Sequence, residues 1–232
     1  YLEIPDDVAT AAPVATAERL DETVAMLKMR WPRPRRPAAP DDGEVVSLAA
    51  RLERAEHPVL VVAGRRRRVS PETVAAFAEA WRVPVFTSSR QKGVLDQGSD
   101  FYAGTFLNGR LERELFDRSD LVILVDPDPF DFYNRPWCFD APAVAFADST
   151  FTDWSNPIAE RLYGDPEATL AALVEAAGSG ARRVASAWTA DNVAGYRSIL
   201  RDTLLPASER LSVSQAVDAA LSAWPSDGYL IA

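Results

Sequence analysis

Four consecutive arginines follow a short apolar run and a glycine in HPVLVVAGRRRRVSPE, residues 57–72. The turn after a buried strand of a parallel sheet can hold a nucleotide phosphate, and the guanidinium of Arg65 or Arg66 could bind a pyrophosphate through two hydrogen bonds. Against this, Gly64 is alone where a phosphate-binding loop usually has two or three glycines, and adjacent arginine side chains point in different directions. We therefore favour a structural or subunit-contact role for this turn over phosphate binding.

The two residue types best suited to nucleophilic or metal chemistry each occur once, as Cys138 and His57. A single histidine disfavours a histidine metal site or a Ser-His-Asp triad. Cys138 lies in RPWCFD, where only Arg135 could lower the pKa of the thiol, so a Cys-His nucleophile pair is also disfavoured. Neither residue type therefore points to catalysis in this chain.

A second polar stretch, DPDPFDFYNRPW at 126–137, carries Asp126, Asp128 and Asp131. Three neighbouring carboxylates could bind a divalent cation. The alternation of proline and aromatic residues favours a strand-end loop instead, so we expect no metal site here. The aromatic side chains could line a pocket over the end of the sheet, but we favour packing against a neighbouring domain for Phe130, Phe132, Tyr133 and Trp137.

The composition limits the class of protein. The 232 residues carry a net charge of −9 and are 47% hydrophobic, which is enough for one core. The negative charge disfavours nucleic acid as a partner, and no apolar run reaches the roughly 20 residues that span a bilayer. One cysteine excludes an intrachain disulfide framework and fits a reducing cytoplasm. The chain opens on YLEIPDDV and stops on DGYLIA, two strand-like stretches, so we expect it to be part of a longer polypeptide.

Alternating helix and strand patterns between residues 43 and 178 predict the elements that would position these side chains. Apolar runs predict strands at 58–64, 83–88, 120–126, 141–148 and, at a sheet edge, 160–165. Helical patterns lie at 44–55, 70–81, 109–119 and 165–177. The second of these helices has Ser70 as N-cap and Pro71 at its first position. The spacing indicates βαβ units and hence an α/β fold, a Rossmann-like parallel sheet of about six strands with helices on both faces.

The flanks of this region have a different pattern. Residues 9–42 look like a connector, with a short amphipathic helical stretch before the basic, proline-rich RWPRPRRPAAPDD. Beyond residue 178, a helix over roughly 181–204 leads to a further helix capped by Ser212 and then to a strand. We therefore divide the chain into the end of a preceding domain (1–8), a connector (9–42), the sheet domain (43–178), a linker helix (179–210) and the start of a following domain (211–232).

In order, these stretches resemble the central domain of thiamine diphosphate-dependent enzymes of the acetolactate synthase and benzoylformate decarboxylase group. YLEIPDDV is similar to the last strand of the family's pyrimidine-binding domain, and LERAEHPVLVVAG is similar to its run of helix, proline, apolar strand and glycine. VPVFTSSRQKGVL, YAGTF, RSDLVILVDPDPFDF and GDPEATLAAL resemble the later strand ends and helices of the central domain. RLSVSQAVDAALSAWPSDGYLIA resembles the first helix and strand of the diphosphate-binding domain. The resemblance covers nearly the whole chain, apart from the extended connector at 9–36.

The resemblance implies that this chain is the central, mainly architectural part of an enzyme that decarboxylates or ligates 2-oxo acids. The catalytic glutamate, and the Gly-Asp-Gly and Asn that hold Mg²⁺ on thiamine diphosphate, would lie in flanking domains of the same polypeptide. No Gly-Asp-Gly occurs here, so we expect no catalytic residue in this chain and expect it to bind neither thiamine diphosphate nor Mg²⁺. The parent enzyme would be a cytoplasmic homodimer or homotetramer.

The resemblance also raises the question of an FAD or ADP site, because some relatives bind these nucleotides at the carboxyl ends of the strands of the central domain. The corresponding positions are Gly64, Arg65, Ser88, Lys92, Gly104, Thr105, Asp126 and Asp148. Two alternatives to the enzyme stay open. One is a free-standing Rossmann-like module that binds FAD or ADP, which would need a glycine-rich loop that the chain lacks. The other is a catalytically inactive interaction protein that keeps the architecture.

Overall fold

The computed structural model describes residues 21, 39–64, 68–128, 131, 137–147, 158–178, 185–205 and 211–225. The chain divides into two compact units, Tyr1–Arg36 and Pro37–Ala232, and the helices and strands named below all belong to the second. The helix expected in the connector and the strand expected at the end of the chain lie outside the described residues. No described helix combines the length and the apolar character needed to cross a membrane.

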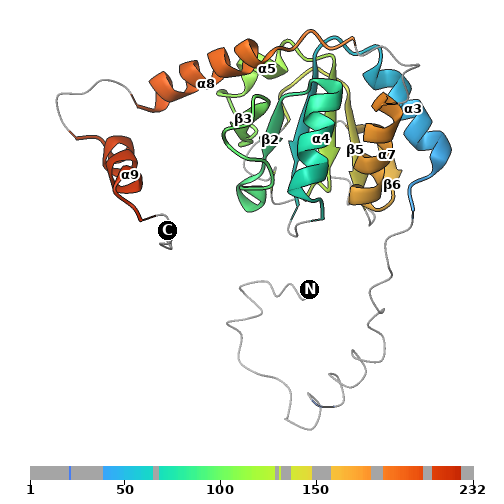
Figure 1. Cartoon of the computed structure of the whole chain (residues 1–232), viewed down its shortest axis with the longest axis horizontal. Helices are drawn as coiled ribbons and strands as arrows, with labels where there is room; N and C mark the ends of the chain where they lie inside the picture. The colour runs from blue at the N-terminus through green and yellow to red at the C-terminus, as the bar shows by residue number, and fades with distance from the viewer. Residues whose placement is uncertain are drawn as a thin grey trace. The chain divides into compact units, whose positions relative to one another are not determined.

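A six-stranded parallel sheet forms the centre of the described structure (Figure 1). In spatial order its strands are β3 (Tyr102–Thr105), β2 (Val85–Thr87), β1 (Pro58–Val62), β4 (Leu121–Val125), β5 (Ala143–Ala147) and β6 (Ile158–Tyr163). Every residue of β1, β4 and β5 is buried, which explains why these strands are continuous apolar runs rather than alternating ones. The predicted α/β fold is confirmed, and the predicted edge strand is β6.

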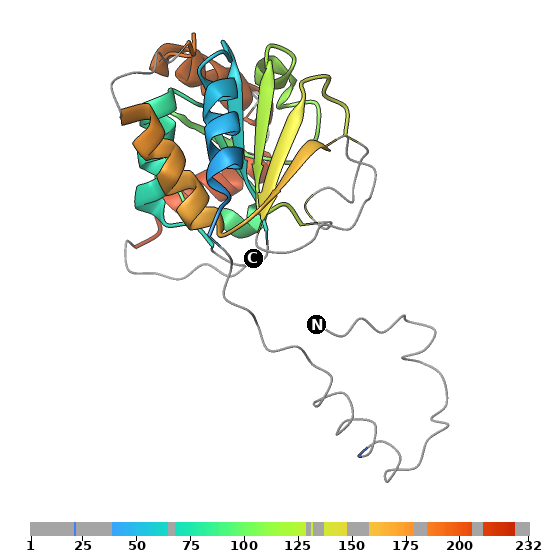
Figure 2. The same ribbon diagram turned by 90° about the vertical axis from the view of Figure 1, so that its right-hand side faces the viewer.

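Helices cover both faces of the sheet, as predicted. On one face, α3 (Asp42–Leu52), α4 (Pro71–Trp81) and α7 (Pro166–Gly178) share a core with Leu60 and Val62 of β1. Figure 2 shows α3 and α7 on the same side of the sheet. On the other face, α5 (Arg113–Phe116) and α8 (Ala190–Leu204) share a core with Val59 and Val61. Because successive side chains of a strand point to opposite faces, each apolar strand supplies both cores.

Helix α4 begins at the residues that the sequence predicts. The Ser70 hydroxyl accepts the Thr73 N–H at 3.1 Å, and Pro71 occupies the first turn, where no intrahelical N–H donor is needed. The helix ends at Arg82, whose φ of 54° is left-handed. Helix α9 (Val213–Ser222) likewise begins at its predicted N-cap, Ser212.

Side-chain hydrogen bonds tie α4 to α7. The Glu167 carboxylate accepts the Ser70 N–H at 2.7 Å and the Thr73 hydroxyl at 2.6 Å, both at the start of α4. Near the other end of α4, Trp81 Nε1 donates to the Leu173 carbonyl at 3.0 Å. These bonds fix the two helices side by side over one face of the sheet.

Two predicted helices are shorter in the structure. The helix expected at 109–119 is reduced to Arg113–Phe116, because the buried Glu112 carboxylate accepts the N–H groups of Leu107 and Gly109 and so holds the preceding residues as a loop. The helix expected from about 181 begins only at Ala190, where Thr189 and Asn192 form a capping box. In both cases a side-chain contact, rather than the apolar pattern, decides where the helix starts.

Candidate functional site

The strand order creates a topological switch point between β1 and β4. From β1 the chain proceeds to β2 and β3 on one side, whereas from β4 it proceeds to β5 and β6 on the other. Ligands of open α/β sheets bind at such a point, outside the carboxyl ends of the strands. Backbone bonds hold these ends together, since Ala63 donates to the Val125 carbonyl at 3.0 Å and Ser88 to the Val62 carbonyl at 2.8 Å. A nucleotide site of this domain would therefore lie here.

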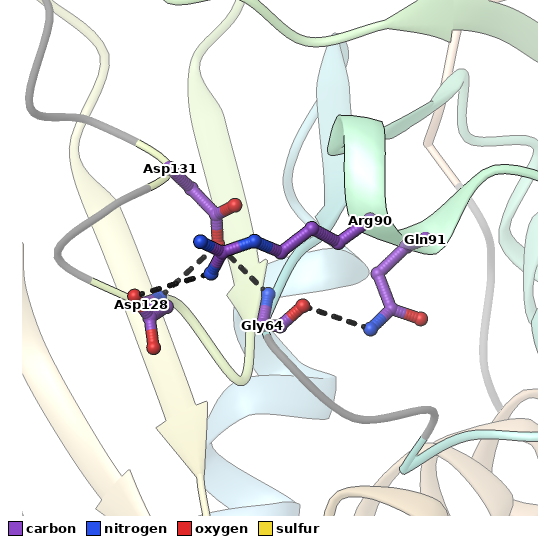
Figure 3. Close-up of polar contacts among 5 residues, drawn as sticks. All are labelled: Gly64, Arg90, Gln91, Asp128 and Asp131. Carbon is purple, nitrogen blue, oxygen red and sulfur yellow. Dashed lines mark hydrogen bonds and ion pairs between the residues drawn. The ribbon is translucent and has the colours of Figure 1, made fainter. Parts of the chain in front are cut away.

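Gly64 follows β1 at this switch point, the crevice of an open α/β sheet, and Figure 3 shows it between Asp131 and Gln91. Its N–H donates to Asp131 Oδ2 at 2.9 Å, and its carbonyl accepts Gln91 Nε2 at 3.0 Å. Its φ is +95°, and a Cβ at this position would lie 2.6 Å from both the backbone oxygen and Oδ2 of Asp126. The glycine is therefore required by backbone conformation and by the close approach of the loop after β4.

Charged side chains surround this glycine. Asp131 Oδ2 also accepts the Asp128 N–H at 3.3 Å, and Arg90 Nη1 lies 3.6 Å from Asp128 Oδ1. Burial raises the pKa of Asp131 above its usual value of 3.8, and the nearby charge of Asp128 raises it further. The hydrogen bond from the Gly64 N–H and the charge of the Arg90 guanidinium lower this pKa without cancelling the increase. The crevice thus holds an internal network of Gly64, Arg90, Gln91 and the carboxylates of Asp128 and Asp131.

The strand-end positions named from the sequence fall into three groups. Those at the crevice are Gly64, Ser88 and Asp126. Those elsewhere in the described structure are Lys92, which follows the short 3₁₀ helix Ser89–Gln91, and Gly104 and Thr105, which lie on the edge strand β3. Those outside the described residues are Arg65 and Asp148. Gly104 faces α8, because a Cβ there would lie 3.7 Å from Leu200 Cδ2. The structure therefore brings only part of the expected set to one place.

Two participants in this network are not among the residues expected from the sequence. Arg90 and Gln91 belong to the short 3₁₀ helix η1 (Ser89–Gln91) that follows β2, and Gln91 is buried. The only signal for them was the polar run SSRQ directly after an apolar strand. Nothing in their spacing from Gly64, which lies 27 residues before Gln91, indicates the contact between them.

The acidic residues of this loop do not form a metal site in the described structure. No group of three or more histidine, cysteine, aspartate or glutamate side chains within the described residues could hold a metal ion. Asp131 receives two backbone N–H groups, and Asp128 pairs with Arg90. The carboxylates of Asp128 and Asp131 are therefore engaged with donors of the chain itself.

Two buried hydroxyls lie beside the crevice. Within the described residues, Thr87 Oγ1 and Ser88 Oγ have no hydrogen-bond partner, and the two residues are 0% and 2% exposed. Since they are closed off from solvent, they offer no contact to a ligand in this conformation.

Comparisons with known proteins identify relatives for most of this chain. The profile of the family described as "Thiamine pyrophosphate enzyme, central domain" matches residues 45–173. The probable 2-ketoarginine decarboxylase AruI of Pseudomonas aeruginosa is 31% identical over 235 residues, which cover 99% of this chain. The chain spans only 39% of the length of that relative. These matches give no support to a free-standing module that binds FAD or ADP.

One solved structure shares the fold, and a second was found with a lower score. A putative thiamin diphosphate-dependent enzyme from Mycobacterium smegmatis superposes with a TM-score of 0.53 at 22% identity, over 62% of this chain and 29% of that one. Benzoylformate decarboxylase from Polynucleobacter necessarius has a TM-score of 0.49 at 16% identity, over 73% of this chain and 31% of that one. With the profile match covering more than half of its residues, the chain belongs to the family of thiamine pyrophosphate enzyme central domains.

Proposed function

We propose that the chain is the central, mainly architectural domain of a thiamine diphosphate-dependent enzyme that decarboxylates or ligates 2-oxo acids. The observation that carries this proposal is the family match at 45–173, which coincides with the described structure from α3 to α7. The relative with 31% identity is itself named a decarboxylase. Because the chain spans 39% of that relative, the active site is assigned to flanking domains.

The domain boundaries form part of the proposal. Residues 1–8 would end the pyrimidine-binding domain, 9–42 would connect it to the central domain at 43–178, and 179–210 would link to a diphosphate-binding domain that starts at 211. The start of α3 at Asp42 and the end of α7 at Gly178 support the limits of the central domain. The new N-cap at Ser212 supports the last boundary. The parent enzyme would be a cytoplasmic homodimer or homotetramer with thiamine diphosphate and Mg²⁺ bound outside this chain.

The test is a decarboxylation assay on the complete polypeptide. The purified protein would be depleted of cofactor, and CO₂ release would be measured with pyruvate, benzoylformate and 2-ketoarginine, with and without thiamine diphosphate and Mg²⁺. Cofactor-dependent release from a 2-oxo acid is the expected result, and 2-ketoarginine is the first substrate to test because of the name of the relative. A complete protein that neither binds the cofactor nor consumes or joins any 2-oxo acid would contradict the proposal.

The same chain studied alone provides the matched control. By isothermal titration calorimetry, residues 1–232 should bind neither thiamine diphosphate nor Mg²⁺, because the sequence contains no Gly-Asp-Gly motif to hold the metal on the cofactor. Tight binding of the cofactor by this chain alone would contradict the assignment of the cofactor site to the flanking domains.

A further inference from the structure

The backbone N–H of Gly64 occupies the place at which a nucleotide-binding sheet meets its ligand. It follows β1, at the switch point between β1 and β4, where the first turn of a Rossmann-like domain presents amide groups to a pyrophosphate. In this chain the same N–H already has an anionic partner, Asp131 Oδ2, at 2.9 Å. The carboxylate comes from a residue 67 positions further along the chain.

Contacts from two further segments hold this arrangement (Figure 3). From the loop after β4, the Asp128 N–H donates to the same Asp131 oxygen. From η1 after β2, Gln91 holds the Gly64 carbonyl and Arg90 pairs with Asp128. Both the N–H and the carbonyl of Gly64 are therefore hydrogen-bonded to side chains of the same chain.

The described carboxylates beside Gly64 also disfavour a phosphate group. Asp126 lies against Gly64, and Asp128 and Asp131 complete an acidic loop beside it. A pyrophosphate would bring further negative charge next to these carboxylates. Repulsion between the phosphate and the carboxylates would be strong in a partly buried site. The arginines at 65–67 lie outside the described residues.

We propose that the Asp131 carboxylate takes the position of a nucleotide phosphate on the Gly64 N–H, so that this crevice is filled by the chain's own anion and does not accept FAD or ADP. The nucleotide that related central domains bind therefore does not fit here. The role of Asp131 is that of a positioning residue, since it fixes the loop after β4 against the end of β1. This inference is independent of the reaction that the complete enzyme catalyses.

The first experiment observes the contact directly in the unaltered full chain. In ¹⁵N–¹H NMR spectra recorded as a function of pH, the Gly64 amide resonance should follow the titration of one carboxyl group, because that group accepts its hydrogen bond. In the Asp131→Asn variant this pH-dependent shift should disappear. A Gly64 resonance that ignores pH in the wild type, or that titrates unchanged in the variant, would overturn the proposal.

The second experiment tests whether the position is an anion site. Asp131→Ala removes the carboxylate, and Asp140→Ala removes an exposed carboxylate just before β5, at the amino end of the strands, as a matched change of charge. Thermal unfolding would be measured with inorganic phosphate, with ADP and with FAD, each against chloride at equal ionic strength. We expect phosphate to raise the unfolding temperature of Asp131→Ala by about 3 °C and to leave the wild type and Asp140→Ala unchanged.

Two outcomes of this second experiment contradict the proposal. Stabilisation of the wild type by ADP or FAD beyond the chloride control would show that the crevice is open to nucleotides. Equal responses of Asp131→Ala and Asp140→Ala to phosphate would show that the vacated position does not bind anions. If Asp131→Ala does not fold, the wild-type titrations and the Asp131→Asn spectra decide the question.

Discussion

Replacing Gly64 by alanine tests the geometry at the centre of the sheet. The residue has a φ of +95°, which side chains other than glycine rarely adopt. The new Cβ would lie 2.6 Å from the Asp126 backbone oxygen and 2.6 Å from its Oδ2, and neither distance is compatible with van der Waals contact. Asp126 cannot yield easily, because its own φ of 48° is left-handed and its N–H is bonded to the Phe146 carbonyl.

The expected cost follows from these two effects. Holding a non-glycine residue in a sparsely populated backbone region costs about 1–3 kcal/mol, and displacing the Asp126 loop adds to it. We therefore expect Gly64→Ala to lower the free energy of unfolding by about 2–4 kcal/mol. This is a large fraction of the roughly 5–15 kcal/mol that typically stabilises a domain.

Gly195→Ala is a matched control with the opposite expected sign. Gly195 lies in the interior of α8 and is exposed, and a Cβ added there would have no other heavy atom within 4 Å outside its own helix backbone and chain neighbours. Alanine there reduces the conformational entropy of the unfolded chain and favours the helix, so it should stabilise by about 0.5–1 kcal/mol.

Equilibrium urea unfolding would measure both variants. The fluorescence of the buried Trp81 and Trp188 reports on the two faces of the sheet. Opposite signs for the two glycine variants would support the assigned conformation of Gly64. A Gly64→Ala protein within about 0.5 kcal/mol of the wild type would refute it, since the strain and the contact would then be absent.

Three further predictions concern the contacts that hold the helices. Burial raises the pKa of Glu167, but hydrogen bonds from the hydroxyl and amide groups at the start of α4 outweigh it and lower that pKa below its usual 4.5. The ionised carboxylate therefore stabilises the fold above pH 4.5, and this contribution is lost as the pH falls through the lowered pKa. Glu167→Gln should lower the free energy of unfolding by about 1 kcal/mol at neutral pH and by progressively less in acid. Urea unfolding at several pH values would measure this difference. A cost independent of pH would contradict this. Trp188→Phe removes a buried hydrogen bond to the first carbonyl of β1 and should lower the free energy of unfolding by about 1–3 kcal/mol. Trp224→Phe is the control, since this residue is 42% exposed, and it should change the free energy of unfolding by less than about 0.5 kcal/mol in the same assay. Glu160→Gln breaks a partly exposed ion pair between β6 and α3 and should also cost less than about 0.5 kcal/mol by thermal unfolding, so a larger loss would show that the pair matters more than its exposure implies.

Local sequence determined the types of most elements, although β3 at Tyr102–Thr105 was not predicted as a strand. Continuous apolar runs identified β1, β4 and β5, because strands buried on both faces need apolar side chains at every position. Ser70 and Ser212 marked the starts of α4 and α9, because an N-cap acts on amide groups only two or three residues away. The limits of α5 and α8 were missed, because the Glu112 loop and the capping of Thr189 compete with the helical pattern.

The candidate site was only partly visible in the sequence. Gly64 and Asp126 were recognised as strand-end residues, but the residues that each of them contacts were not predicted. Asp131 in the sequence is one carboxylate among several, and its identity as the acceptor of the Gly64 N–H depends on the adjacency of β1 and β4. The part played by Gln91 depends in the same way on the adjacency of β1 and β2.

The sequence by itself therefore determined the class of fold, the family and some residues that directly follow strands, such as Asp126 after β4. Only the tertiary structure decided which strand ends meet and which anion the Gly64 amide binds. The physical reason is that secondary structure depends on interactions over a few residues, whereas the contents of the crevice depend on strand order, which joins residues 67 positions apart.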